Sequence, residues 1–217
     1  MKLHNGSFVC SNGEYDIIDC EACGFKHVYP LPTHEELENI YKNEYYTNIK
    51  PEYFDNHQRD HDWWMLSYSA RLQKIGKNTL SEGKRFLDVG SGPGLMLEAA
   101  VRTGWDAMGL EPNVSAFDFA RSRGCNVVNG FLTKDIAAQL GKFDAIHSSE
   151  VLEHIRDPSA MIALMVTMLN PGGSLCIVVP NDFNPLQKAL VSSRIQNQWW
   201  VAPPYHLNYF SHASMKN

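Results

Sequence analysis

The chain has 217 residues, of which 44% are hydrophobic and 20% are charged, and its formal net charge is −5. This composition indicates a globular protein and excludes a disordered chain, and the length suffices for one α/β domain with a small appendage. The acidic balance, without a Lys/Arg block, argues against a nucleic-acid partner, and no apolar run has the length of a membrane span or of a signal-peptide core. We therefore expect a cytoplasmic monomer or homodimer that has no membrane association.

Residues 8–29 have the pattern of a small β-ribbon. Asn12-Gly13 lies between two short runs of strand-forming residues, which is a typical hairpin signal. Thr33 and Glu36 have the spacing of a capping box, so we expect a helix from His34 to about Asn43.

Two cysteines of the ribbon have the spacing of a metal-binding turn. A Cys-x-x-Cys-Gly run begins at Cys20 and includes Cys23, and this is half of a zinc ribbon. No second Cys-x-x-Cys pair is visible. Cys20 and Cys23 are therefore candidate zinc ligands, with Cys10 as a third ligand and His4 or His27 as a fourth. The alternative is a β-ribbon with two leftover thiols.

A long helix and then a strand–loop–helix unit follow. Residues 57–77 place apolar side chains at roughly helical spacing. Residues 85–89 read as a buried parallel strand, and Gly90, Gly92 and Gly94 alternate in the loop after it. Such a loop lets a ligand lie directly against backbone amides at the carboxyl end of a parallel strand.

The spacing of this loop discriminates between ligands. A dinucleotide fingerprint, G-x-G-x-x-G, would place its third glycine at position 95, where the chain has Leu95. The third glycine comes one residue earlier, at Gly94. The next strand ends in Glu111, whose carboxylate can accept hydrogen bonds from both hydroxyls of a ribose. An NAD-binding oxidoreductase remains the rival interpretation.

The run Leu-Asp-Val-Gly-Ser-Gly-Pro-Gly, with Glu111 at the end of the next strand, resembles the class I methyltransferases that use S-adenosylmethionine (SAM). The order Cys-x-x-Cys-Gly, Pro-x-Pro, Glu-Glu-Leu and Tyr-x-x-x-Tyr-Tyr is similar to the bacterial type 11/12/23 group, which has a zinc-ribbon-like leader. The resemblance implies a leader over residues 1–47, a SAM domain over 48–217, and S-adenosylhomocysteine (SAH) as a product. The cofactor contacts it implies are Asp88, Gly90, Ser91, Gly92, Gly94, Glu111, Pro112, Phe131 and Ser148.

Three further strands are expected at 125–128, 143–147 and 174–180, the last one introduced by an L-x-P-G-G turn at 169–173. Five strands alternating with helices predict an α/β fold with a doubly wound, mostly parallel sheet and a small N-terminal β-ribbon and helical appendage. The family pattern adds an antiparallel hairpin after the fifth strand. We expect that hairpin to be missing, as in a fragment or a shortened member.

An acid–histidine motif follows the fourth strand. If this turn is helical, Glu150, Glu153 and His154 converge on one face. Such a triple can bind a divalent cation, or it can hold His154 as a general base oriented by a carboxylate. In the alternative interpretation Glu150 caps a helix and His154 fills a core niche. The motif is similar to that of ubiquinone-biosynthesis O-methyltransferases. It is also similar to that of small-RNA 3′-terminal 2′-O-methyltransferases, and in this second group the motif and a later histidine bind a metal.

A cluster rich in aromatic residues and proline supplies candidate substrate contacts, Tyr205, His206 and Tyr209. The leading hypothesis is O-methylation of a small molecule or a sugar hydroxyl. The alternatives are a nucleotide-sugar C-methyltransferase and a SAM-binding partner or regulatory protein without catalysis.

Overall fold

The computed structural model describes residues 4–42 and 52–216. It divides into two compact units, which interleave along the chain. Unit 1 comprises Met1–Leu37, Glu150–Pro158 and Val178–Asn217, and unit 2 comprises Glu38–Ser149 and Ser159–Ile177. The boundary expected between residues 47 and 48 lies outside the described residues, as do the tyrosines at 45 and 46. The C-terminal residues, which we expected in the SAM domain, belong to the same unit as the ribbon.

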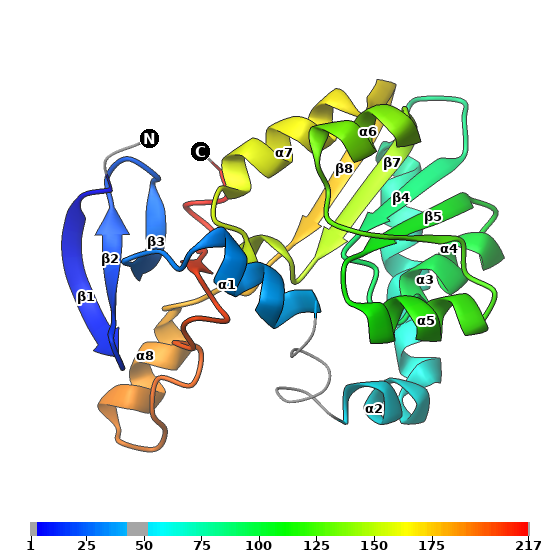
Figure 1. The fold of residues 1–217 in the computed structure, drawn as a ribbon. Helices are drawn as coiled ribbons and strands as arrows, with labels where there is room; N and C mark the ends of the chain where they lie inside the picture. Colours follow the sequence, from blue (N-terminus) through cyan, green and yellow to red (C-terminus); the bar gives the residue numbers. More distant parts are fainter. Residues whose placement is uncertain (1–3, 43–51, 217) are drawn as a thin grey trace. The chain divides into compact units, whose positions relative to one another are not determined.

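Unit 2 is built on a five-stranded sheet with the order β6-β5-β4-β7-β8 (Figure 1). Its strands are β4 (Arg85–Val89), β5 (Asp106–Glu111), β6 (Val127–Asn129), β7 (Phe143–Ser149) and β8 (Leu169–Val178). Strand β4 pairs in parallel with β5 and with β7, and β5 pairs in parallel with β6. The predicted doubly wound, mostly parallel α/β sheet is confirmed.

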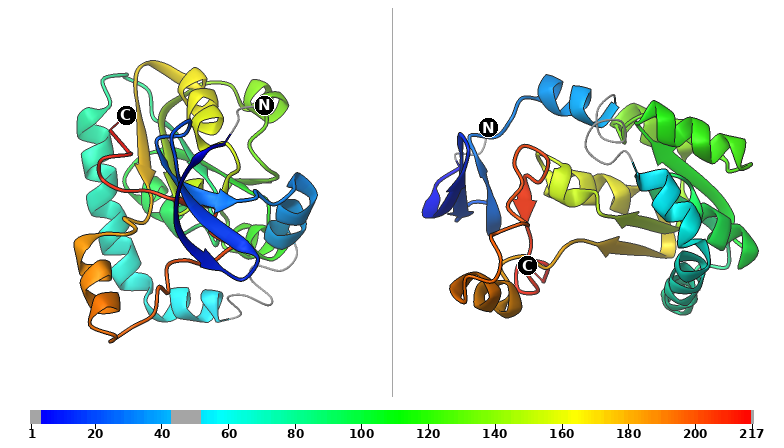
Figure 2. Two further views of the ribbon diagram at one scale, coloured as in Figure 1. Left: turned by 90° about the vertical axis from the view of Figure 1, so that its left-hand side faces the viewer. Right: turned by 90° about the horizontal axis from the view of Figure 1, so that it is seen from below.

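Helices cover both faces of this sheet (Figures 1 and 2). They are α2 (Tyr53–Arg59), α3 (His61–Asn78), α4 (Leu95–Arg102), α5 (Val114–Ser122), α6 (Lys134–Leu140) and α7 (Pro158–Thr167). Phe86 and Ala145 belong to the core cluster with residues of α3, α4 and α5. Successive strand residues point to opposite faces, so Leu87 and Ile146, both fully buried, lie on the other face of the sheet.

The single helix predicted over 57–77 is in fact two helices. Helix α2 ends at Arg59, and α3 begins at His61 after Asp60. The apolar side chains of Leu72 and Ile75, which follow one another at helical spacing, are buried in the core.

Unit 1 contains an antiparallel sheet with the order β1-β2-β3-β9, in which β9 pairs with β3. Its strands are β1 (Gly6–Asn12), β2 (Tyr15–Cys20), β3 (Phe25–Tyr29) and β9 (Asn208–Tyr209). The predicted hairpin is confirmed, since Asn12 pairs with Tyr15. Helix α8 (Pro185–Ser192) and the 3₁₀ turn η2 (Leu152–His154) belong to the same unit.

The predicted capping box begins helix α1 (His34–Asn39). The backbone N–H of Thr33 donates to Glu36 at 2.7 Å, and the N–H of Glu36 donates to the Thr33 hydroxyl at 3.2 Å. The end expected at Asn43 lies outside the described residues.

In the part of the chain that the structure describes, the sheet of unit 2 consists of these five strands. After β8, residues of the chain form α8 and then β9, which joins the ribbon sheet. The L-x-P-G-G run was expected as a turn before β8, but it belongs to that strand, which begins at Leu169. No described helix combines the length and the apolar character that crossing a membrane requires.

Candidate functional site

The glycine loop of unit 2 connects β4 to α4. Gly90, Gly92 and Gly94 have φ values of 76°, 50° and 85°. Gly94 precedes the first residue of α4 in a left-handed conformation, and a Cβ there would lie 2.8 Å from the Cys125 sulfur. A side chain at position 94 would therefore be strained and would clash, so this position requires glycine.

A glycine in the neighbouring strand lets the loop pack closely. A Cβ on Gly109 of β5 would lie 2.5 Å from the Ser91 hydroxyl and 2.7 Å from Leu97. The Ser91 side chain, expected among the cofactor contacts, thus lies against β5 and is 7% exposed. Close packing at this position fixes the loop between the two strands.

Glu111 ends β5 and joins the glycine loop to the start of α5. Its Oε2 accepts a hydrogen bond from the Gly92 N–H at 2.8 Å, and its Oε1 accepts one from the Asn113 N–H at 2.9 Å. The side chain is 4% exposed. Burial raises the pKa of Glu111 from 4.5 to about 7, against the opposing effect of the two N–H groups. Each oxygen keeps a second lone pair with which it can accept a hydroxyl donor.

Asn113 is a functional candidate that the sequence analysis did not single out. It is the N-cap of α5, and its side chain accepts a hydrogen bond from the Ala116 N–H at 3.1 Å. The amide nitrogen of the same side chain donates to the backbone carbonyls of Tyr41 and Lys42, each at 3.0 Å. Asparagine before an amphipathic run is a recognisable cap signal, but its bonds to residues so distant in sequence are not visible in a motif.

The Lys42 ammonium lies over the ring of Phe131, 5.8 Å from the ring centroid. Phe131 is half-buried, as is Pro112 directly after Glu111. Ser148 lies near the end of β7, opposite Val89 of β4, and is 1% exposed. These expected cofactor contacts thus lie on the loops and carboxyl ends of the central strands in unit 2.

The side chain of Asp88, another expected cofactor contact, has a partner in the core of unit 2. Its Oδ1 lies 2.7 Å from His147 Nδ1, and the Arg71 guanidinium lies 3.0 Å from His147 Nε2. Since arginine only donates, Nε2 accepts, and the Nδ1–H therefore donates to Asp88. Asp88 Oδ1 thus links β4 to β7, and through His147 and Arg71 to α3.

A second set of chemistry-bearing residues lies in unit 1. Here Glu150, Glu153, His154, Asp182 and His206 are called the acid–histidine cluster. Glu150 follows β7 directly with a φ of 56° and precedes η2. The turn is therefore not the regular helix that we expected, and Glu150 does not cap it, because residue 151 occupies the N-cap position without a side-chain cap. The three acids still interact with one another electrostatically.

Burial dominates the electrostatics of this cluster. Glu153 is fully buried, and desolvation, followed by the neighbouring carboxylates of Glu150 and Asp182, raises its pKa well above the ordinary range. The pKa of Asp182 is raised from 3.8 to about 6, again mainly by burial. Both shifts favour the protonated, uncharged acid.

A backbone carbonyl orients the His154 ring at Nδ1. Its Nδ1 lies 2.6 Å from the carbonyl oxygen of Tyr205, so the neutral ring donates its Nδ1–H there. In that tautomer Nε2 carries the lone pair and lies 3.9 Å from Glu153 Oε1. The ring of His206 packs edge-on against that of His154, with 5.0 Å between centroids. In this tautomer Nε2 is the nitrogen of the His154 ring that can accept a proton.

Hydrogen bonds to backbone carbonyls hold the 3₁₀ turn in place. The side-chain amide of Asn208 donates to the carbonyls of Leu152, at 2.9 Å, and of Ile155, at 2.6 Å. The Leu207 N–H donates to the Glu153 carbonyl at 2.7 Å. Tyr209, which the sequence analysis named as a candidate substrate contact, is 2% exposed, and its hydroxyl donates to the His206 carbonyl.

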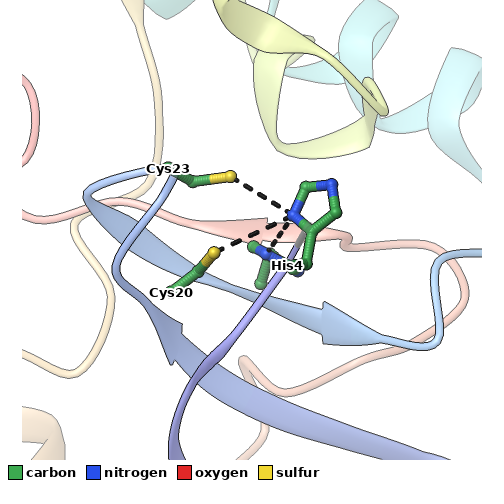
Figure 3. Close-up of side chains that lie close together, drawn as sticks. His4, Cys20 and Cys23 are labelled. Atoms are coloured by element: carbon green, nitrogen blue, oxygen red, sulfur yellow. Dashed lines mark hydrogen bonds between the residues drawn. The ribbon is translucent and has the colours of Figure 1, made fainter. Parts of the chain in front are cut away.

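The candidate metal ligands of the ribbon lie elsewhere in unit 1. Cys20 and Cys23 come together with both His4 and His27. Figure 3 shows the two cysteines with His4. Within residues 4–42 and 52–216, this is the one group of three or more His, Cys, Asp or Glu side chains whose ligand atoms converge. The third ligand expected, Cys10, is not in the group. Among the described residues, the ligand atoms of the acid–histidine cluster do not converge in this way.

Comparisons with known proteins agree with this architecture. Residues 56–217 match the type 23 family model described as a methyltransferase domain. The ubiquinone biosynthesis O-methyltransferase of Methylococcus capsulatus is 30% identical over 130 residues, covering 53% of this chain and 55% of the relative. The enzyme of that name from Coxiella burnetii (strain Dugway 5J108-111) is 34% identical over 133 residues, covering 52% of this chain and 55% of the relative. The chain thus spans about half the length of these curated relatives.

A solved structure is similar over most of the chain. The plantazolicin methyltransferase BpumL, in complex with SAH, superposes with a TM-score of 0.60 at 16% identity. The match covers 83% of this chain and 70% of that protein. At this identity the likeness shows a shared fold.

Proposed function

Because the chain belongs to the type 23 methyltransferase domain family, we propose that it transfers the methyl group of SAM to a hydroxyl group of a small molecule. The observation that supports the proposal most strongly is the placement of Glu111. Its buried carboxylate connects the glycine loop to the cap of α5 and keeps acceptor capacity on both oxygens. That is the chemistry that the 2′- and 3′-hydroxyls of a ribose require.

In this proposal the glycine loop receives the methionine part of SAM. The loop N–H groups already donate within the fold, to Leu110, Ser91 and Glu111. The first N–H groups of α4, which have no intrahelical acceptor, are the donors that suit the methionine carboxylate. The aromatic face of Phe131 suits the adenine ring. Because His147 binds Oδ1 of Asp88, Oδ2 is the atom of this carboxylate that we assign to a cofactor contact.

The loop disfavours a dinucleotide. Leu95 occupies the position of the third fingerprint glycine, is 4% exposed, and begins α4. A pyrophosphate would have to approach the backbone where this side chain packs. SAM carries no pyrophosphate and does not need that approach.

We assign proton removal to the acid–histidine cluster, because Glu150 follows β7 with no residue between them and His154 has an oriented Nε2. In the reaction the acceptor oxygen forms a bond to the methyl carbon as the sulfur–carbon bond breaks. The bonding pair goes to sulfur, which gives SAH, and the hydroxyl proton goes to His154 Nε2. The names of the ubiquinone-biosynthesis relatives support an oxygen nucleophile on a small molecule. Sugar hydroxyls are a further acceptor class in this proposal.

Calorimetric titration with SAM, SAH and NAD tests the cofactor, and SAH release in a library of phenols and sugars tests the reaction. We expect SAM and SAH to bind, NAD not to bind, and at least one hydroxyl acceptor to release SAH. Binding of NAD without SAM would contradict the cofactor assignment. Tight SAM binding without turnover across the library would instead favour a partner protein without catalysis, and a product methylated on carbon would favour the nucleotide-sugar alternative.

A further inference from the structure

Four side chains at the base of the ribbon point toward one centre. His4 precedes β1, Cys20 ends β2, Cys23 lies in the turn after it, and His27 lies in β3. One ligand atom of each lies within 4.8 Å of those of the other three. Figure 3 shows both sulfurs directed toward the same nitrogen of the His4 ring.

Hydrogen bonding does not account for this convergence. His4 Nδ1 lies 3.1 Å from His27 Nε2, 3.5 Å from the Cys23 sulfur and 3.8 Å from the Cys20 sulfur. A ring nitrogen has either one proton or one lone pair, so it forms one good hydrogen bond. Three heteroatoms around a single nitrogen indicate instead that all four atoms surround a shared point.

The three separations measured from His4 Nδ1 match those of a tetrahedral zinc site. With Zn–N of about 2.05 Å and Zn–S of about 2.3 Å, a tetrahedron places two nitrogens about 3.3 Å apart, a nitrogen and a sulfur about 3.6 Å apart, and two sulfurs about 3.8 Å apart. The distances of 3.1, 3.5 and 3.8 Å from His4 Nδ1 lie close to these values. Binding therefore needs only small side-chain adjustments.

The surroundings prepare the ligands. His27 Nδ1 lies 2.7 Å from the Val28 carbonyl, so the ring donates its proton there and turns the lone pair of Nε2 toward the group. The Gly24 N–H donates to the Cys20 carbonyl at 2.9 Å, and Gly24 has a φ of 75°. This tight turn brings the two cysteines to one side.

We propose that His4, Cys20, Cys23 and His27 bind one zinc ion in a closed, structural Cys₂His₂ site. Two thiolates and two imidazoles select zinc over magnesium or calcium, which require oxygen ligands. Four protein ligands leave no open position for catalysis. The ion would join the start of the chain to β2, to the following turn and to β3.

The site also supports the acid–histidine cluster through strand β3. The Val28 N–H, next to the ligand His27, donates to the Leu207 carbonyl at 2.9 Å, and the Leu207 N–H donates to the Glu153 carbonyl. His27 itself pairs with Asn208 in β9, which holds the 3₁₀ turn. We therefore expect zinc to position this turn as well as to stabilise the ribbon.

Metal content of the untagged full-length protein tests the proposal. After dialysis against a weak chelator, elemental analysis should give about one zinc per chain. Cys20→Ala and His27→Ala should lose most of this zinc, whereas Cys10→Ala, a matched control outside the group, should keep it. Absence of zinc from the wild type, or equal loss in Cys10→Ala, would overturn the site.

Cobalt titration provides a second readout that does not depend on how well the variants fold. Zinc-stripped wild-type protein should bind one cobalt with the visible absorption of a tetrahedral site and with thiolate charge-transfer bands. A pale octahedral spectrum without thiolate bands would refute the ligand set. Both readouts are independent of methyl transfer, so an inactive protein that binds zinc would contradict the proposed function alone.

Discussion

Replacing Glu111 by Gln separates the two effects of one buried carboxylate. Gln keeps the size of the side chain and one acceptor oxygen, but it cannot ionise. In the native chain, burial raises the pKa of Glu111 from 4.5 to about 7. The folded state therefore binds the proton more tightly than the unfolded state does.

This shift predicts that stability falls as pH rises. Between 4.5 and about 7 the folded state holds more protons than the unfolded state, so the free energy of unfolding decreases across this window. Complete titration of Glu111 costs about 3 kcal/mol, of which about 2.5 kcal/mol falls between about pH 5 and about pH 8. Glu153 and Asp182 act in the same direction, so the comparison with Glu111→Gln isolates the share of Glu111.

The substitution should also weaken cofactor binding. A hydrogen bond to a charged group contributes about 1.5–3 kcal/mol, and Gln loses about one such bond to the ribose. We expect Kd for SAH to rise about 10- to 150-fold at neutral pH. The Glu111 carboxyl of the unliganded protein ionises near pH 7. We therefore expect the affinity of the wild type for SAH to decrease as pH falls below about 7, and we expect the Gln variant to lack this dependence.

Urea unfolding at the two pH values, with calorimetry for SAH, measures both effects. In the variant, one backbone N–H loses the carboxylate oxygen that accepts its hydrogen bond, which lowers the free energy of unfolding by the same amount at every pH. The difference between the two proteins in the slope of this free energy with pH therefore reports only the titration of Glu111. A variant with the wild-type pH slope would refute the reasoning on burial. A variant that binds SAH as tightly as wild type would refute the ribose assignment.

Three further substitutions test other parts of the account. His154→Ala should reduce kcat at least about 100-fold while SAH affinity stays within about twofold, and unchanged turnover in the acceptor assay would disprove the base assignment. In Gly109→Ala the new Cβ would press against Ser91, so we expect stability to fall by about 1–3 kcal/mol and SAH binding to weaken. Gly76→Ala is the matched control, because its Cβ would meet its nearest neighbour at 3.8 Å; we expect this variant to gain up to about 1 kcal/mol in urea unfolding. If the two alanines have equal effects, the close packing of the loop is wrong. Asn208→Ala leaves two carbonyls of the 3₁₀ turn without their donor, so we expect a loss of about 1–3 kcal/mol and a fall in turnover at unchanged SAH affinity; wild-type turnover would contradict a positioning role.

The sheet of unit 2 was predictable because its determinants are local. Each buried strand is a short apolar run followed by a turn signal, and the glycine loop and Glu111 are separated by a single helix. Right-handed crossover connections then restrict the possible strand orders. The hairpin at Asn12 and the capping box at Thr33 were predictable for the same reason.

Features that depend on long-range pairing were not predictable. The pairing of β9 with β3 places residues of the C-terminal part in the ribbon sheet, and no periodicity in the sequence signals it. The proposed zinc site needs both His4 and His27, which are brought together only by the fold, whereas Cys10 has the right chemistry but lies elsewhere on β1. Likewise, a helical spacing rule placed Glu150 on a helix, but its positive φ starts a 3₁₀ turn.

A crystal structure with SAH tests the central claim most directly, namely that unit 2 holds the cofactor through the glycine loop and Glu111. The account predicts the 2′- and 3′-hydroxyls of the ribose at hydrogen-bonding distance, about 2.5–3.0 Å, from the two carboxylate oxygens of Glu111. It also predicts the amino-acid part of SAH against the backbone of residues 90–94. A ribose bound away from Glu111, or a glycine loop that makes no contact with SAH, would contradict it.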